Sequence, residues 1–438
     1  MLMLKWLEER RAACQMRFEE IRFADSREWR LTEKGLVHET GGFFSVQGIA
    51  GKSMASGLSA FAQPIINQPE IGILGFIVSG SGGAYRWLVQ AKAEPGNVGT
   101  VQLAPSVQAT YSNYTRKHGG AATHYLECFA APDVSIVGDS LQSEQGTRFL
   151  TKFNRNMLCD VSCDLPLVNE QYCWFSAAQM RAALALDFAI NTDARSVIVC
   201  SPWKYLADPK GAFGGTMPIQ RVLSRSYAHT SSRDIVGTAQ QKLDKLRLSM
   251  DLQLETVPLE ALSGWRFGDT SIVVSDAGES SLEVRHYHVT SPEREKDKWD
   301  QPLVLSTSSD EVMLFCQQRD GVLHFLLRPA YEVGLTGGVE FGPSHKLETV
   351  VTQPEWLRTL AEHQEWETLI QVEQSDEGGR FMGACCVYSI RQIPANYSVF
   401  EDTENFWVTL QEVEKLCAAP GILTNEARSV ISLLLAFI

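Results

Sequence analysis

Short stretches with alternating apolar and polar residues, separated by glycine-rich turns, run through each half of the chain. Apolar residues at every second position are typical of strands that bury one face. In the first half the pattern predicts strands in GGFFSVQGI, IGILGFIVSG, YRWLVQAKAE, GTVQLAP and SVQATYSNY. This half opens with a helical pattern at 5–21 and closes with another at 176–186. Helices that flank a mostly antiparallel sheet predict an α+β fold.

The same skeleton occurs twice along the chain. LVQAKAEPGN at 88–97 returns as LLRPAYEVGL at 326–335, with Leu, Glu and Gly at matching positions 238 residues apart. ARSVI at 194–198 returns unchanged at 427–431, and we expect both copies to be helical. The matches stay in order, so the sequence predicts two tandem copies of one unit.

We expect the two copies to occupy residues 1–205 and 234–438. Residues 206–233 lie between them and include KGAFGGTMP, whose glycines and proline are typical of a linker loop. A chain of 438 residues is long enough for about two or three domains.

One strand face in the first copy carries many polar groups. In the stretch 87–94, Gln90, Lys92 and Glu94 alternate with apolar residues, so they share one face. In the stretch 106–114, the residues on one face are Ser106, Gln108, Thr110, Ser112 and Tyr114. Such a face either meets solvent or lines a pocket in which polar groups hold a hydroxylated ligand.

The second copy helps to choose between these interpretations. It has Ala330 at the position of Lys92, and the other polar positions of the set change as well, whereas Glu94 is kept as Glu332. We expect residues present in both copies to carry the fold and residues present only in the first copy to carry function. Glu94 stays open between bracing a turn and taking part in catalysis.

A second polar segment, LQSEQGTRFLTKFNRN, covers residues 141–156. Its arginines are the kind of charged, partly bidentate donor that binds a diphosphate. Arg148 recurs as Arg380, which favours a structural role, whereas Arg155 maps to Val387 and is the sharper candidate for a ligand contact. A salt-bridged surface helix or strand is the alternative interpretation.

Composition and charge argue against several classes of partner. The net charge of −13 argues against nucleic acid, which binds to basic surfaces. No apolar run reaches the ~18 residues that a membrane span needs. The ten cysteines are scattered, without a CxxC motif or a Cys/His spacing typical of zinc, so we expect a reduced, cytoplasmic protein.

Several blocks of the first copy resemble the signature blocks of the NDP-hexose 2,3-dehydratases. They are GGFFSVQG, QPIINQPEIGILGF, LVQAKAEPGN, QLAPSVQATYSNYTRKHGG and LQSEQGTRFLTKFNRN. The second copy follows the family in outline, through WDQPL, EFGPS, SDEGGRF and NEARSVISLL. It departs from the family at 342–353, where GPSHKLETVVTQ replaces a second PTVQ-type block, so the sequence does not predict a second substrate pocket.

The resemblance implies two tandem Nudix-like modules, the first catalytic and the second degenerate, in a homodimer. It implies a lyase that removes water across C2 and C3 of a nucleotide-linked 4-keto-6-deoxyhexose, usually a dTDP sugar, on the way to 2,6-dideoxysugars. This chemistry requires no cofactor and no metal. The candidate substrate-binding residues are Gln63, Gln90, Gln108, Thr110, Ser112, Asn113, His118, Glu144, Arg148, Asn154 and Arg155.

The implied reaction needs a base for the C3 proton, a donor for the oxygen at C4, and an acid for the C2 hydroxyl. Lys92 fits the donor, and Tyr114 fits either the donor or the acid. Glu94 is the leading base, because it lies ~6–7 Å along the strand from Lys92. Glu144 and His118 are rival bases.

Two other functions compete with this interpretation. A non-catalytic sugar-nucleotide sensor or scaffold subunit is one, and the complete polar face of the first copy argues against it. A Nudix-type nucleotide-sugar hydrolase is the other, but LEERR and RFEEIR lack the glutamate spacing that its metal site requires.

Overall fold

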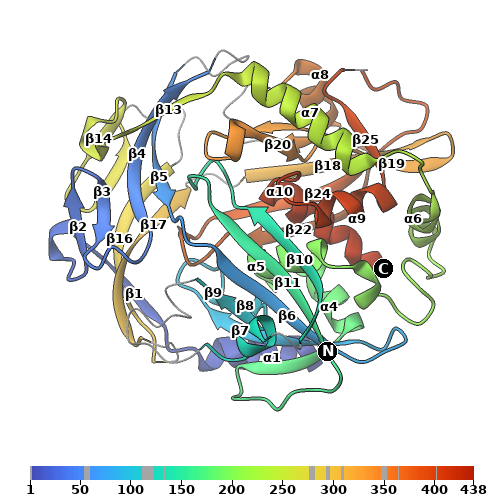
Figure 1. The fold of residues 1–438 in the computed structure, drawn as a ribbon, viewed down its shortest axis with the longest axis horizontal. Coiled ribbons are helices and arrows are strands. Elements are labelled where there is room, and N and C mark those ends of the chain that lie inside the picture. The colour runs from blue at the N-terminus through green and yellow to red at the C-terminus, as the bar shows by residue number, and fades with distance from the viewer. Residues whose placement is uncertain are drawn as a thin grey trace.

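The computed structural model describes residues 2–53, 60–110, 123–131, 134–275, 282–292, 296–306, 310–346, 353–363, 365–400 and 402–438 (Figure 1). The elements of the first half are α1 (Leu2–Ala13), β1 (Arg17–Ile21), β2 (Trp29–Thr32), β3 (Gly35–His38), β4 (Ser45–Lys52), β5 (Phe61–Asn67), β6 (Gly72–Ser79), β7 (Arg86–Ala93), β8 (Val101–Ala104), β9 (Val107–Ala109), α3 (Glu127–Ala130), β10 (Ser135–Ser143), β11 (Phe153–Val161), β12 (Tyr172–Ser176), α4 (Ala177–Leu184) and α5 (Thr192–Cys200). Those of the second half are α6 (Pro218–Ala228), α7 (Ile235–Met250), β13 (Gln253–Val257), β14 (Trp265–Phe267), β15 (Ser271–Val274), β16 (Leu282–Thr290), β17 (Lys298–Ser306), β18 (Asp310–Arg319), β19 (Val322–Tyr331), β20 (Val339–Gly342), β21 (His345–Lys346), α8 (Glu355–Glu362), β22 (Glu367–Ser375), β23 (Phe381–Met382), β24 (Cys385–Ile393), β25 (Phe406–Thr409), α9 (Leu410–Ala418) and α10 (Asn425–Ser432).

Two seven-stranded sheets have the same strand order. The first runs β10-β11-β6-β7-β12, with β8 paired to β7 and β9 to β6. The second runs β22-β24-β18-β19-β25, with β20 paired to β19 and β21 to β18. Each contains one parallel pair, β6–β11 or β18–β24, so the sheets are mixed rather than purely antiparallel. The predicted repeat therefore appears as the same succession of strands and helices.

Two smaller sheets lie side by side at one end of the molecule and exchange a strand (Figure 1). Strand β1 of the first repeat pairs with β16, and its counterpart β13 of the second repeat pairs with β4. The sequence pattern at 5–21 predicted one continuous helix, but α1 ends at Ala13 and RFEEI forms β1 instead. Pairing with a distant strand outweighs the local helical preference of these residues.

The two identical ARSVI segments form the centre of the molecule, within the buried helices α5 and α10, which pack against each other. Arg195 is fully buried and donates to the backbone carbonyl of Ser375 at 3.0 Å. Arg428 is fully buried as well and donates to the equivalent carbonyl, that of Ser143. Each arginine thus binds the other repeat, and because a buried guanidinium needs such acceptors, both copies require the same residue.

Two glycine turns join the repeats reciprocally. The N–H of Gly96 donates to the carbonyl of Gly378 at 2.9 Å, and the N–H of Gly334 donates to the carbonyl of Gly146 at 2.7 Å. A Cβ on Gly96 would lie 1.6 Å from the carbonyl oxygen of Phe381, so only glycine allows this approach. The shared Glu-x-Gly skeleton is therefore an inter-repeat joint.

The segment between the repeats, expected to be a loop, contains helix α6. Pro218 occupies the first turn of this helix, where its missing N–H has no cost. The hydroxyl of Ser226 donates to the carbonyl of Leu323 and accepts from the N–H of Leu410, which fixes α6 to the second repeat.

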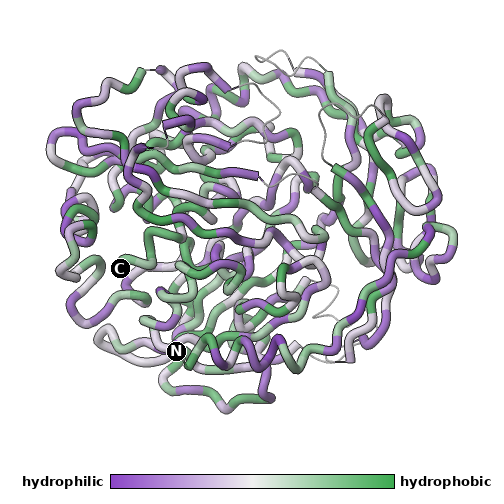
Figure 2. Tube along the Cα trace, turned by 180° about the vertical axis from the view of Figure 1, so that it is seen from behind, coloured by the Kyte–Doolittle hydropathy of each residue, from purple (hydrophilic) through white to green (hydrophobic). Residues whose placement is uncertain are grey.

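Figure 2 shows apolar segments running through the large sheets and the central helices. Within the described residues, no helix is both long and apolar enough to span a membrane.

Candidate active site

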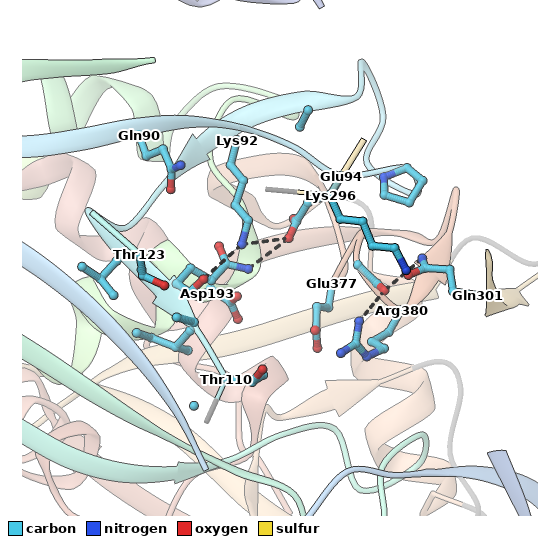
Figure 3. A pocket seen from close by; sticks show the side chains of 18 of the residues that line it. Gln90, Lys92, Glu94, Thr110, Thr123, Asp193, Lys296, Gln301, Glu377 and Arg380 are labelled. Atoms are coloured by element: carbon cyan, nitrogen blue, oxygen red, sulfur yellow. Dashed lines mark hydrogen bonds and ion pairs between the residues drawn. The ribbon is translucent and has the colours of Figure 1, made fainter. Parts of the chain in front are cut away.

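A cavity of about 430 Å³ lies where the polar strand face of the first repeat meets loops of the second (Figure 3). The first repeat contributes residues from β7, β9 and β11, and from the start of α5. The second repeat contributes the segment around β17 and the SDEGGRF loop. The polar and charged residues that line it include Gln68, Gln90, Lys92, Glu94, Gln108, Thr110, Lys152, Asn154, Asp193, Lys296, Gln301, Glu377 and Arg380.

Lys92 and Glu94 form the polar centre of the first-repeat wall. The Lys92 Nζ lies 3.5 Å from the Glu94 Oε1 and 3.5 Å from the Gln108 carbonyl oxygen. The Gln108 amide donates to the Glu94 Oε1 at 3.0 Å, and the Asn97 amide donates to its Oε2 at 3.1 Å. These donors fix the orientation of the buried Glu94 carboxylate at the cavity wall. Both side chains come from alternate positions of one strand, as the polar pattern predicted.

Asp193 adds a second carboxyl group to this side of the cavity. It lies in the first turn of α5, whose N-cap residue Asn191 donates its side-chain amide to Gln108 at 3.1 Å. Burial, together with the neighbouring carboxyls of Glu377, Glu144 and Glu94, raises the pKa of Asp193 well above its ordinary value.

The second-repeat wall is formed by the SDEGGRF loop, residues 375–381. Burial raises the pKa of Glu377 to about 7, while the guanidinium of Arg380 opposes the shift. Arg380 donates from Nε to the Gln68 side chain at 3.1 Å and lies 4.2 Å above the Phe44 ring. The Gln301 amide approaches the Gly379 carbonyl at 3.4 Å.

Behind the cavity, Glu144 accepts hydrogen bonds from the side-chain amides of Asn154 at 2.8 Å and Asn425 at 2.9 Å. Burial raises the pKa of Glu144 and lowers the pKa of Lys152. Carboxyl groups of both repeats therefore lie at or directly behind one cavity, and burial raises the pKa values of Asp193, Glu144 and Glu377. Perturbed carboxyl groups gathered at a cavity are typical of sites that transfer protons.

Aromatic side chains cover the rest of the wall. The rings that line the cavity belong to Trp29, His38, Phe43, Phe44, Tyr172 and Trp299. Trp29 is held by its indole N–H, which donates to the Asp300 carbonyl at 2.6 Å. Flat apolar surfaces beside charged donors suit a ligand that has both a ring and a charged or hydroxylated part.

A family model for NDP-hexose 2,3-dehydratases matches the chain twice, at residues 2–201 and 237–434. The chain belongs to this family. It is 30% identical over 441 residues to a dTDP-4-dehydro-6-deoxy-α-D-glucopyranose 2,3-dehydratase of Saccharopolyspora spinosa, covering 98% of this chain and 89% of that one. Enzymes with the same name from Amycolatopsis orientalis and Streptomyces violaceoruber are also 30% identical, over 98% of this chain and 88% and 95% of theirs. The resemblance noted from the sequence blocks is thereby confirmed.

The structure brings several of the candidate residues of this dehydratase together. Those that line the cavity are Gln90, Lys92, Glu94, Gln108, Thr110 and Asn154. Glu144 lies directly behind Asn154. Four candidates, Ser112, Asn113, Tyr114 and His118, lie outside the described residues.

Gln63 and Arg148 do not line the cavity, although their counterparts Gln301 and Arg380 do. The Gln63 amide donates to the Thr147 carbonyl at 2.8 Å, in the equivalent loop of the first repeat. Arg148 borders a separate hollow of about 20 Å³, roughly the space of one water molecule. Because each loop docks on the other repeat, the cavity of the first repeat uses the loop residues of the second.

Arg155 lies on the exposed side of β11, away from the cavity. Its guanidinium forms two hydrogen bonds with the Asp139 carboxylate on β10, and half of its side-chain surface is exposed. Asn154, its neighbour, points inward instead, as alternation along a strand requires. This placement does not support the expected ligand contact of Arg155.

The second repeat has a buried lysine–carboxylate cluster of its own. Lys346, at the position of Gln108, lies 2.7 Å from Glu426 and 3.7 Å from Glu332. The other oxygen of Glu332 accepts from the N–H of Gly146 at 2.7 Å. Here the lysine comes from a different strand, and the glutamate binds the inter-repeat joint.

Sequence reasoning did not single out Asp193, Glu377, Arg380 or Gln301 as site residues. The SDEGGRF block was visible as a family block, but its position in the cavity of the other repeat depends on the exchange of loops. The sequence did contain one indication of a functional residue in this loop: the second copy has Glu377 where the first has Gln145. Among the described residues, no group of three or more His, Cys, Asp and Glu side chains could hold a metal ion.

Proposed function

We propose that the protein removes water across C2 and C3 of a dTDP-linked 4-keto-6-deoxyhexose, in the formation of 2,6-dideoxysugars. Family membership gives the reaction class. The observation that carries the assignment to this cavity is the Lys92–Glu94 pair, buried at the wall of a space large enough for a sugar.

The chemistry assigns a role to each member of this pair. The 4-ketone acidifies the C3 proton, and Glu94 takes it as the base. The ammonium group of Lys92 stabilises the negative charge that develops on the C4 oxygen. A positioned base of this kind contributes ~10²–10⁴ in rate, and an aimed donor for the oxygen adds about 10²–10³.

The rest of the cavity suits the nucleotide. The aromatic wall around Trp29, Phe43 and Phe44 offers a surface on which thymine stacks. Arg380 lies above the Phe44 ring and supplies a guanidinium for the diphosphate. Tyr114 remains a candidate acid or donor in the part of the chain that the structure does not describe.

The organisation of the enzyme belongs to the same proposal. We assign residues 1–205 to a catalytic Nudix-like repeat, 206–233 to a linker and 234–438 to a second Nudix-like repeat that braces the first and closes its cavity. We place the enzyme, as a homodimer, in the reducing cytoplasm, which the ten free cysteines support.

Incubation with dTDP-4-keto-6-deoxyglucose tests the reaction, with loss of one water per sugar followed by mass spectrometry. Lys92→Ala should lower turnover by about 10²–10³. Lys346→Ala is the matched control, because it removes the buried lysine of the second repeat and should lower stability rather than turnover. A protein that binds the nucleotide sugar without converting it would instead be a sugar-nucleotide sensor. Cleavage of the diphosphate would indicate a Nudix-type hydrolase.

A further inference from the structure

Glu377 lies across the cavity from the Lys92–Glu94 pair and belongs to the second repeat (Figure 3). The Cβ position that a side chain at 379 would take is 3.6 Å from the Glu94 Oε1 and 3.9 Å from the Glu377 Oε1. The two carboxyl groups therefore lie on the same side of Gly379, and all three residues line the cavity.

The two repeats differ at these loop positions. The loop of the first repeat, which docks on the second, carries Gln145 and Thr147 where the second has Glu377 and Gly379. At these two positions, only the loop that closes the large cavity thus has a carboxyl group and a glycine.

The backbone holds Glu377 in place. The loop is joined to the turn of the first repeat by hydrogen bonds from Gly96 to Gly378, at 2.9 Å, and from Gly383 to Gly96, at 3.0 Å. Its own turn closes through N–H groups of Arg380 and Phe381 that donate to the Glu377 carbonyl at 2.9 and 2.8 Å. These bonds fix the backbone from which the Glu377 side chain extends, so the residue lies at the cavity wall before a substrate enters.

Burial and neighbouring charges adjust the acidity of Glu377. Burial raises its pKa to about 7, Arg380 and Lys152 oppose the shift, and Glu144 and Glu94 add to it. Asp193 is a further carboxyl group that interacts with it. At neutral pH the group can therefore give up or take up a proton. The carboxylate of Glu94, in contrast, accepts hydrogen bonds from the side-chain amides of Gln108 and Asn97.

We propose that Glu377 is a second catalytic residue, which protonates the C2 oxygen as it departs; this inference rests on the proposed dehydration. After Glu94 has taken the C3 proton, the electron pair of that bond forms the enolate of C3 and C4. The enolate pair then restores the C4 carbonyl and forms a double bond between C2 and C3. The C2–O bond breaks, and its oxygen leaves as water with the proton of Glu377.

The remaining proton transfers restore both groups. The product of elimination is an enol with a hydroxyl at C3 and a double bond between C2 and C3. Glu94 returns its proton to C2, and the ionised Glu377 takes the proton of the C3 hydroxyl, which gives the 3,4-diketo sugar. No proton or electron is gained or lost in the cycle apart from the released water.

The experiment compares two rates in heavy water with the full-length enzyme. One is exchange of the C3 hydrogen of the substrate for deuterium, and the other is loss of water. In Glu377→Gln we expect elimination to fall by about 10²–10⁴ while exchange continues, because the enolate still forms but returns to substrate. In the parent enzyme we expect activity to fall at alkaline pH as Glu377, whose pKa burial raises to about 7, loses its proton. This fall should disappear in Glu377→Gln. Glu377→Asp should recover part of the elimination.

Glu367→Gln is the matched control for the same chemical change, since Glu367 is exposed at the start of β22. Elimination by Glu377→Gln at the parent rate would overturn the inference. Equal loss of exchange, elimination and dTDP binding would overturn it as well, because it would show a structural role. If Glu377→Gln does not fold, Glu377→Asp takes its place. The inference would then be contradicted if activity of Glu377→Asp fell with rising pH at the same midpoint as activity of the parent enzyme. Failure of the parent enzyme itself to release water would refute the proposed function instead.

Discussion

The N–H of Gly96 donates to the carbonyl of Gly378 at 2.9 Å and thereby joins the turn after β7 to a loop of the second repeat. Gly334 and Gly146 form the equivalent joint in the other direction. Each joint is a backbone hydrogen bond between glycines of the two repeats, but among the described residues only the first joint lies next to the large cavity. This asymmetry allows stability and activity to be tested separately.

Gly96→Ala and Gly334→Ala should both lower the thermal midpoint of unfolding. An added Cβ would lie 1.6 Å from the Phe381 carbonyl oxygen in one case and 1.9 Å from the Phe149 carbonyl oxygen in the other. Overpacking of this kind costs about 1–3 kcal/mol or more. Gly96→Ala should also lower turnover, because the displaced loop carries Glu377, whereas Gly334→Ala should not. In the control Gly268→Ala the nearest atom is 3.3 Å away, and we expect a smaller change.

Glu94→Gln and Glu332→Gln separate catalysis from turn bracing. If Glu94 is the base, turnover of Glu94→Gln should fall by ~10²–10⁴ while dTDP still binds. Glu332→Gln should keep turnover and change only stability, because its carboxylate binds Lys346 and Gly146. If Glu94→Gln instead keeps its turnover and only its melting temperature falls, Glu94 braces the turn and is not the base.

The two arginines should differ in their effect on nucleotide binding. Arg380→Ala should weaken dTDP binding about tenfold or more, since a charged hydrogen bond contributes about 1.5–3 kcal/mol. Arg155→Ala should leave binding unchanged, because its guanidinium pairs with Asp139 at the surface. Titration calorimetry with dTDP measures both. Weaker binding in Arg155→Ala alone would show that the nucleotide lies outside this cavity.

Stability should fall as the pH rises from about 4.5 to about 8. Burial, followed by repulsion from Glu426, raises the pKa of Glu332 to about 8, whereas the unfolded chain releases this proton near 4.5. The folded state therefore holds the proton more tightly; its stabilisation is complete below the unfolded pKa and is lost as the pH rises through the folded one. Melting temperatures between pH 5 and 8 should decline less steeply in Glu332→Gln than in the parent enzyme. An equal slope would contradict the raised pKa.

Turnover should survive exhaustive chelation. The 4-ketone already acidifies the C3 proton, and Lys92 supplies positive charge for the C4 oxygen, so the proposed steps use no metal ion. Activity after dialysis against EDTA, with and without added divalent cations, is the measurement. Loss of activity that a divalent cation restores would require a metal-assisted mechanism.

The sequence by itself determined the repeat, the strand faces and the family. Alternation placed Gln90, Lys92 and Glu94 on one face because strand geometry is local, and the structure finds all three on the cavity wall. The helical patterns at 176–186 and in both ARSVI copies also became helices, since their caps and apolar spacing lie within the segments themselves.

Only the tertiary structure decided which repeat supplies each wall of the cavity. RFEEI forms a strand paired with β16 although its sequence pattern is helical, and the SDEGGRF loop of the second repeat packs against the first repeat. In both cases contacts between distant segments outweigh local conformational preference. Sequence alignment of the copies paired Arg148 with Arg380 but could not tell that they line different spaces. The site thus combines a strand face that the sequence specifies with a loop whose position depends on the packing of the two repeats.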